Sequence, residues 1–294
     1  MYELVSVTEN DYYIDCPSKV GLVRIEGNDF AAIDSGNDRD AAKKVLRTVR
    51  AQGWNLTAVF NTHGHADHIG GNRYLQEQTG CRVYAAGVEQ AFTRYPDLEL
   101  FTLCGGCPPK ELRNKFFLAQ TCIAELLTDE ALPKRLHAVP LPGHTGEMTG
   151  YRTDDGTFYV GDAISSEETL RKYALTYQYD LAASLRTLEW LETAEAACFV
   201  PSHAPACADI APLARKNAET LRENAALICS LCREPVTFEE LLKRLFDMEN
   251  IPMSLGQFYL IGSTLRSYLT WLCEVGSVSY EFSDNRMLYC AKEN

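Results

Sequence analysis

The sequence predicts an α/β fold of layered strands and helices, with a small α+β unit at its C-terminal end. Two observations indicate the layered part: short apolar runs alternate with helical segments, and several of these runs end in a glycine turn that carries histidine or aspartate. A third observation indicates the smaller unit. Glu234-Pro235 interrupts a helical pattern, and two further helices and a hairpin signal follow it.

The composition is that of a globular protein. Of the 294 residues, 46% are hydrophobic and 23% are charged, which suits one large domain or one domain with a small appendage. The net charge of -12 disfavours nucleic acid and anionic membranes as partners. No apolar run approaches the roughly 18–20 residues that a membrane-spanning helix needs. We therefore expect neither a nucleic-acid nor a membrane partner.

The N-terminal residues and the cysteines both favour a cytoplasmic protein. Met1 to Leu4 do not form a basic region followed by an apolar core, so no signal peptide is predicted. Eleven cysteines, an odd number, in a chain without an export signal predict reduced thiols rather than a disulfide framework.

Predicted strands and helices alternate along most of the chain. Strands are expected at residues 4–7, 21–25, 30–33, 56–60, 81–85, 138–141, 158–160 and 198–201. Helices are expected at residues 41–51, 72–78, 181–193 and 217–233. Gly80 is placed to end the second of these helices.

Four ligand-type side chains stand within six residues, directly after the predicted strand 56–60. They are His63, His65, Asp67 and His68, and Gly64 separates the first two. Histidines this close repel one another when protonated and need polar partners when buried. A divalent metal satisfies both needs, because imidazole nitrogen and carboxylate oxygen are good ligands for zinc, iron and manganese. The stretch predicts a metal site rather than a surface loop rich in histidine.

Three later strands end in the same way. His144, Asp162 and His203 each follow an apolar run and lie in or beside a tight turn. Each alone is a weak signal, because a lone aspartate beside glycine usually serves the turn. Together they strengthen the metal interpretation, since five of the six histidines occupy strand-end turns. His137 is the exception, and we interpret it as structural.

Residues 86–132 break the alternation, and we interpret them as a helical insertion that forms a lid or shapes the substrate site. A helix is expected over 110–127. Cys104 and Cys107 form a Cys-x-x-Cys motif in this insertion, which could hold another metal, form a redox disulfide, or simply flank a Gly-Gly turn. Cys229 and Cys232 repeat the spacing inside a predicted helix, where two structural cysteines are the better interpretation.

Residues 229–294 resemble a winged-helix unit. A helix capped by Thr237, a strongly apolar helix after it and a hairpin turn at Asp284-Asn285 give the order of elements. Reading DNA requires a basic recognition helix, whereas residues 258–274 offer only Arg266. We therefore expect this unit to pack against the rest of the chain or to form a homodimer, and to help wall the active-site cleft.

The order of the motifs, His-x-His-x-Asp-His, Gly-His-Thr, Gly-Asp and Ser-His, resembles the metallo-β-lactamase superfamily. The resemblance covers residues 1–228 and implies a catalytic domain with a four-layer αββα sandwich and two metal ions where the two sheets meet. It also implies the ligands: His63, His65 and His144 for the first ion, Asp67, His68 and His203 for the second, and Asp162 between them. Asp34 matches a position beside this site.

Such a centre has a definite chemistry. Two divalent ions, most simply zinc with iron or manganese as alternatives, can share a water and lower its pKa toward neutrality. Asp67 could orient the resulting hydroxide and take its proton, which makes it the predicted catalytic residue. The sequence thus predicts a binuclear metal-dependent hydrolase in which a metal-bridging hydroxide attacks a small-molecule substrate.

Several substrate classes stay open: a small thioester, ester, lactone or phosphoester. Secreted β-lactamases of the superfamily carry export signals and a cysteine where Asp162 stands, so antibiotic hydrolysis is disfavoured. With aspartate at this position, the chain resembles instead thioesterases of the glyoxalase II type, lactonases and phosphodiesterases. Two further hypotheses are an iron-dependent oxidoreductase of the same fold, such as a sulfur dioxygenase, and a metal-dependent regulator whose C-terminal unit binds a partner.

Overall fold

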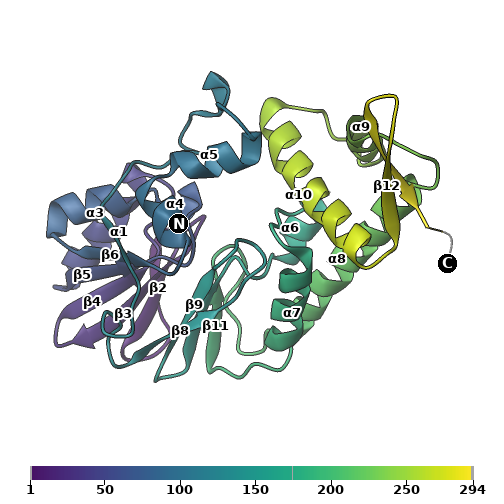
Figure 1. Cartoon of the computed structure of the whole chain (residues 1–294). Helices are drawn as coiled ribbons and strands as arrows, with labels where there is room; N and C mark the ends of the chain where they lie inside the picture. The colour runs from purple at the N-terminus through teal and green to yellow at the C-terminus, as the bar shows by residue number, and fades with distance from the viewer. Residues whose placement is uncertain (1, 174, 293–294) are drawn as a thin grey trace.

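Two β-sheets pack face to face, and helices cover their outer faces (Figure 1). The computed structural model describes residues 2–173 and 175–292. In Figure 1, the first sheet lies at the left with helices α1 and α3 over its upper part, the second sheet stands in the middle, and helices α7 and α8 lie to its right. This is the four-layer αββα sandwich that the family resemblance implies.

The first sheet has seven strands in chain order. They are β1 (Glu3–Ser6), β2 (Asp11–Asp15), β3 (Val20–Glu26), β4 (Asp29–Ile33), β5 (Asn55–Phe60), β6 (Arg82–Ala85) and β7 (Ala124–Leu126). Strands β1 to β4 form an antiparallel meander, and β4 to β7 run parallel to one another. Strand β2 was not predicted.

The second sheet has four strands in the order β11-β10-β9-β8. They are β8 (Leu136–Pro140), β9 (Thr149–Thr153), β10 (Thr157–Gly161) and β11 (Cys198–Pro201). Strands β10 and β11 are parallel, and the other pairs are antiparallel. Parallel strands end at the same edge of a sheet, so the residues after β10 and β11 are neighbours.

The helices agree with the predicted order in most of the chain. They are α1 (Arg39–Ala51), α2 (Ala66–Ile69), α3 (Asn72–Thr79), α4 (Glu89–Arg94), α5 (Asp97–Cys104), the short 3-10 helix η1 (Lys110–Leu112), α6 (Glu167–Lys172), α7 (Leu181–Leu191), α8 (Ala211–Leu231), α9 (Phe238–Met248) and α10 (Leu255–Glu274). A two-stranded hairpin, β12 (Val278–Ser283) and β13 (Arg286–Ala291), follows them.

Alternation along the strands explains the layering. In β4, Phe30 and Ala32 belong to the core beneath α1 and α3, whereas Ala31 and Ile33 belong to the core between the two sheets. Successive strand residues point to opposite faces, so a continuous apolar run can serve two cores at once. Both faces of this sheet are therefore buried.

The predicted helix over residues 110–127 is wrong. Only η1 is helical there, and residues 124–126 form β7, which extends the first sheet beside β6. Pro108 and Pro109 precede this segment, and its apolar residues do not keep helical spacing through residues 119–123. The helices of the 86–132 insertion are α4 and α5, and α5 contacts α10.

The C-terminal helices share a core with the sandwich. Leu241, Leu265 and Leu269 are buried in the same apolar cluster as Phe158 of β10 and Leu188 of α7. This confirms that the unit packs against the rest of the chain. The expected boundary between residues 228 and 229 falls within α8, which runs unbroken to residue 231.

Among the described residues, no helix is long and apolar enough to cross a membrane.

Leu265→Ala should lower the free energy of unfolding by about 2–5 kcal/mol, because a side chain that is 0% exposed would leave a cavity in the shared core. Leu255→Ala is the matched control on the same helix. Its side chain is 41% exposed, so the change should be about 0.5 kcal/mol or less. Urea denaturation followed by circular dichroism measures both. A separate early transition confined to residues 234–292 would contradict a shared core.

Candidate metal centre

The seven predicted ligand residues lie together at one edge of the sandwich. His63, His65, Asp67 and His68 follow β5 of the first sheet. Asp162 and His203 follow the parallel strands β10 and β11 of the second sheet, and His144 lies in the loop between β8 and β9. Three groups of potential ligand atoms converge within 4.8 Å: His63, His65 and His144; His63, His68 and Asp162; and Asp67, His68 and His203.

Asp34 organises the backbone where β4 and β5 end. Its Oδ1 accepts a hydrogen bond from the backbone N–H of Thr62 at 2.8 Å, and its Oδ2 accepts one from the Thr62 hydroxyl at 2.9 Å. Asp34 itself has a left-handed backbone, with φ of 63°, which aspartate and asparagine tolerate better than most residues. The carboxylate thereby fixes the start of the turn that carries the histidines.

Four of the histidines have one ring nitrogen held by the surrounding protein. The contacts to the Nδ1 atoms are Thr62 Oγ1 to His63 at 2.9 Å, Asp34 Oδ2 to His68 at 2.8 Å, the Tyr177 carbonyl to His144 at 3.1 Å, and the Pro17 carbonyl to His203 at 2.7 Å. In each ring the other nitrogen, Nε2, faces the centre. A hydrogen bond of this kind is what commonly sets the tautomer and orientation of a metal-binding histidine.

His65 completes the first group with its Nδ1 atom. This nitrogen lies 3.0 Å from Nε2 of His63 and 3.1 Å from Nε2 of His144. Nitrogens bound to one tetrahedral zinc at about 2.0–2.1 Å lie roughly 3.3–3.4 Å apart. The three imidazoles are therefore close to the spacing that a single ion would impose.

The second group is more open to solvent. Oδ2 of Asp67 lies 3.0 Å from Nε2 of His203 and 3.5 Å from Nε2 of His68. The His68 side chain is fully buried, whereas the side chain of Asp67 is 40% exposed. This group joins a rigid buried donor to a carboxylate that molecules entering the site can reach.

Asp162 lies between the two groups. Its Oδ2 is 3.6 Å from Nε2 of His144 and 3.4 Å from Nε2 of His203, and its Oδ1 is 3.4 Å from Nε2 of His68. Oδ1 is buried, and the 3.4 Å contact with His68 is not a hydrogen bond of ordinary geometry. A buried carboxylate oxygen that is so weakly paired is costly, so this atom suits a cation between the groups.

The histidines of the two groups differ in their pKa values. Burial, together with the nearby rings of His68 and His65, lowers the pKa of His63 well below its usual range, and burial lowers that of His65 to about 3. Both rings are thus neutral, which is the ligand form of histidine. Asp162 raises the pKa of His203 to about 10 against the effect of burial. The carboxylates therefore attract positive charge to the second group.

Two glycines permit the close approach of elements around the site. Gly161, with φ of 57°, faces Thr62, and a Cβ there would lie 3.1 Å from the Cβ of Thr62. A Cβ on Gly64 would lie 2.4 Å from the Cβ of Phe92 on α4. The backbone N–H of Gly64 donates to Oε2 of the buried Glu89 at 2.9 Å. Larger residues at either position would separate the ligand turn from its supports.

Sequence reasoning missed Tyr177 and Glu89. The ring of Tyr177 packs edge-on against His65 and His144, its carbonyl holds His144, and its hydroxyl lies beside Ser263 of α10. Tyr177 lies in a loop without a recognisable motif, so no local pattern could have indicated it. Glu89 stands among alternating polar and apolar residues, and only its burial distinguishes it.

The remaining predicted residues lie away from the seven. His137 is on the surface, with Nε2 2.7 Å from Asp154 Oδ1. Cys107 is exposed, and its Sγ accepts a hydrogen bond from the Arg113 guanidinium at 3.2 Å. Within the described part of the chain, none of the convergent ligand groups includes Cys104 or Cys107.

Residues 13–203 match the profile of the Metallo-beta-lactamase superfamily. The match covers most of the chain and includes all seven residues. The chain belongs to the metallo-beta-lactamase superfamily. This confirms the resemblance inferred from the order of the motifs.

Curated relatives named hydroxyacylglutathione hydrolase are similar over part of their length. The protein of Methylococcus capsulatus is 30% identical over 128 residues, which are 43% of this chain and 41% of that protein. The protein of a Bradyrhizobium species is 29% identical over 154 residues, 51% of each. The chain thus spans about half or less of the length of these relatives.

Two solved structures share the fold over nearly the whole chain. A metallo-beta-lactamase family protein from Thermus thermophilus superposes with a TM-score of 0.73 at 19% identity, covering 98% of this chain and 100% of that one. A beta-lactamase domain protein from Burkholderia ambifaria gives 0.72 at 17% identity, covering 99% and 94%. The C-terminal elements are therefore part of a fold found in other superfamily members.

Asp34→Asn should weaken metal binding at the His68 position roughly 10–100-fold, the usual scale for losing a partner that orients a ligand. Asparagine tolerates the same backbone, so the loss would report the charge and the acceptor oxygen that Asp34 presents to Thr62 and His68. Competition with a chromophoric chelator measures the affinity. Asp154→Asn, at a surface carboxylate that pairs with His137, should leave metal binding unchanged. Equal affinity in wild type and Asp34→Asn would contradict this role for Asp34.

Proposed function

We propose that this protein is a binuclear, divalent-metal-dependent hydrolase that cleaves a small thioester. One observation carries the proposal: five imidazoles and two carboxylates converge, and four of the imidazoles are oriented by a hydrogen bond at the nitrogen that faces away. Superfamily membership supports a divalent metal, and the donor set fits one.

The geometry supports two ligand sets. Nε2 of His63, Nδ1 of His65 and Nε2 of His144 would hold one ion. The second would be held by Asp67, His68 and His203, with Asp162 touching both. Zinc suits a site of imidazole nitrogens and carboxylate oxygens with room left for substrate, and iron or manganese would accept the same donors.

The metal pair would supply Lewis-acid activation of water and of the substrate carbonyl oxygen. The protein contributes orientation and proton handling. Asp67, partly exposed and next to His203, is placed to hold the attacking water and to receive its proton. The water oxygen bonds to the carbonyl carbon, the carbon–sulfur bond breaks, and the proton passes to the leaving sulfur.

The relatives support the thioester class. Their name, hydroxyacylglutathione hydrolase, describes removal of an acyl group carried on glutathione. Lactones and other esters would be attacked at a carbonyl carbon in the same way. Phosphoesters would bind at the same centre, with phosphorus as the atom that is attacked. A regulator is less well supported, because α10 packs into the chain beside the site instead of presenting a free polar face.

Metal-loaded protein should contain two ions per chain and should hydrolyse a simple thioester. Chelator-treated protein should contain no bound metal and should not hydrolyse the thioester. Elemental analysis counts the ions, and release of free thiol from acetyl-N-acetylcysteamine measures hydrolysis. Restoring zinc should restore activity. Anomalous density at a single position, or at Cys104 and Cys107 instead, would contradict the assignment. Iron in the purified protein together with oxygen uptake would favour the oxidoreductase.

Asp67→Asn should retain most metal yet lower kcat by about 10²-fold or more, the scale of losing a general base. Asp162→Asn should mainly lower metal occupancy, because this carboxylate lies between the two groups. Metal content and kcat, measured on the same preparations, separate the two effects. Equal loss of metal in both variants, with activity falling in proportion, would show that the division of roles is wrong.

A further inference from the structure

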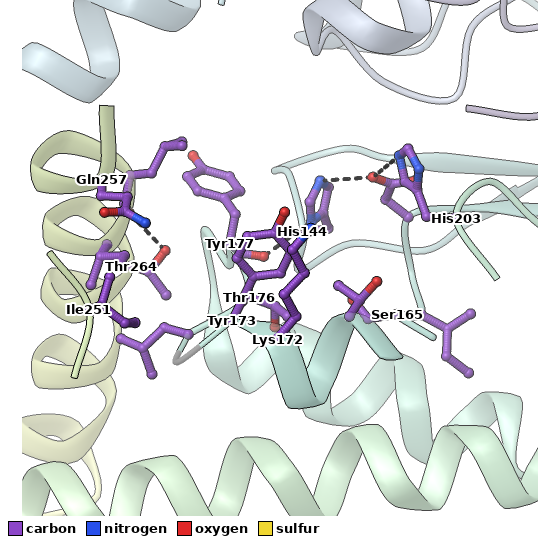
Figure 2. A pocket seen from close by; sticks show the side chains of 16 residues that line it. His144, Ser165, Lys172, Tyr173, Thr176, Tyr177, His203, Ile251, Gln257 and Thr264 are labelled. Carbon is purple, nitrogen blue, oxygen red and sulfur yellow. Dashed lines mark hydrogen bonds and ion pairs between the residues drawn. The ribbon is translucent and has the colours of Figure 1, made fainter. Parts of the chain in front are cut away.

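A cavity of about 570 Å³ runs from the metal centre to helix α10 (Figure 2). His144, Asp162 and His203 line one end of it. Figure 2 shows Thr264 and Gln257 of α10 at the opposite side, with Tyr177 and Tyr173 between the two ends. A substrate bound at the metals could therefore extend toward the C-terminal helix.

The walls of this cavity are mainly apolar. Ile164 and Leu175 contribute from the segment that follows β10, and Ile251, Leu260 and Ile261 contribute from α10 and the turn before it. This volume lies in the range of small-molecule sites, which are usually apolar with a few polar anchors. The metal end supplies the polar anchors.

Several polar groups around the cavity are already paired within the protein. Asn217 of α8 accepts from the backbone N–H of Ser165 and donates to its carbonyl, both at 2.9 Å. The hydroxyl of Thr264 donates to the carbonyl of Leu260 at 3.0 Å. These bonds hold the walls and leave methyl and methylene groups as the principal surface for a ligand.

Helix α10 is also tied to the metal centre itself. Tyr177 packs against His65 and His144, and its hydroxyl lies beside Ser263 of α10. Helix α10 also packs against α5, α7 and α8, so its wall stands at a set distance from the reactive end. A fixed apolar wall at the far end of a reactive centre selects substrates by the length and shape of their apolar part.

We propose that the substrate carries an apolar acyl group, seated between residues 164–173 and 175–177 on one side and α10 on the other, and that α10 sets its length. This inference rests on the proposed hydrolase function. Apart from the histidines, Lys172 is the one basic side chain among the described residues that line the cavity, so an acyl group with several negative charges does not fit. A second cavity beyond Tyr177 carries the carboxyls of Glu89 and Glu99, which suit an apolar chain less well.

Two acyl thioesters of N-acetylcysteamine, acetyl and octanoyl, test the proposal with zinc-loaded full-length protein. The octanoyl compound should have a kcat/KM on the order of tenfold or more above the acetyl compound, because six more methylene groups leave water. Leu260→Trp should remove that advantage, so that the octanoyl and acetyl compounds have similar kcat/KM values. For Leu260→Phe, a smaller change, the ratio of octanoyl to acetyl kcat/KM should lie between the ratios of the wild type and Leu260→Trp. Leu255→Trp, on the exposed start of the same helix, is the matched control and should change neither rate.

Binding of the free acids gives a readout that does not depend on turnover. Octanoate and acetate carry the same carboxylate, so calorimetry on the zinc-loaded protein should show octanoate to bind at least about tenfold more tightly, and Leu260→Trp should abolish the difference. Equal binding of the two acids, or equal kcat/KM for the two thioesters, would overturn the apolar acyl site and leave the hydrolase proposal intact. Absence of any thioester hydrolysis would overturn the hydrolase proposal. The ratio of the affinities for octanoate and acetate would still test whether the cavity binds an apolar chain.

Discussion

The buried carboxylate of Asp34 is the interaction on which the rest of the centre depends. It joins the end of β4 to the turn after β5 through Thr62, and it holds Nδ1 of His68. Thr62 in turn contacts Nδ1 of His63. One side chain, set in a left-handed backbone, therefore orients two imidazoles and the turn between them. Contacts within the protein alone hold the imidazoles in this orientation, and this is how preorganised sites gain affinity.

Most of the site could be predicted because the donors are concentrated in short motifs. His63 to His68 occupy six residues after a strand, and strand ends in parallel sheets meet at one edge. The layered fold was predictable for the same reason, since its strands are short apolar runs bounded by turns. Local pattern and global fold agree in this part of the chain, as they do in sequences that specify one structure.

The parts that were missed depend on tertiary contacts. Residues 124–126 form a strand because they pair with the free edge of β6. The local sequence of these three residues does not predict that pairing. Tyr177 acts through its carbonyl and through the packing of its ring, and neither leaves a motif. The role of α10 was foreseen only in outline. Its apolar residues predicted burial, but the sequence could not show that some of them face a cavity open to the metal centre.

The predicted metal donors come from both halves of the sandwich, which gives metal binding a second consequence. His63, His65, Asp67 and His68 are carried by the first sheet, and His144, Asp162 and His203 by the second. Ions bound by both sets would act as cross-links that clamp the open edge of the two sheets together. The fraction of folded chains would then rise with free metal by mass action. A cell short of metal would lose the protein to proteolysis as well as lose its activity, so supply of the ion would regulate how much of the enzyme exists.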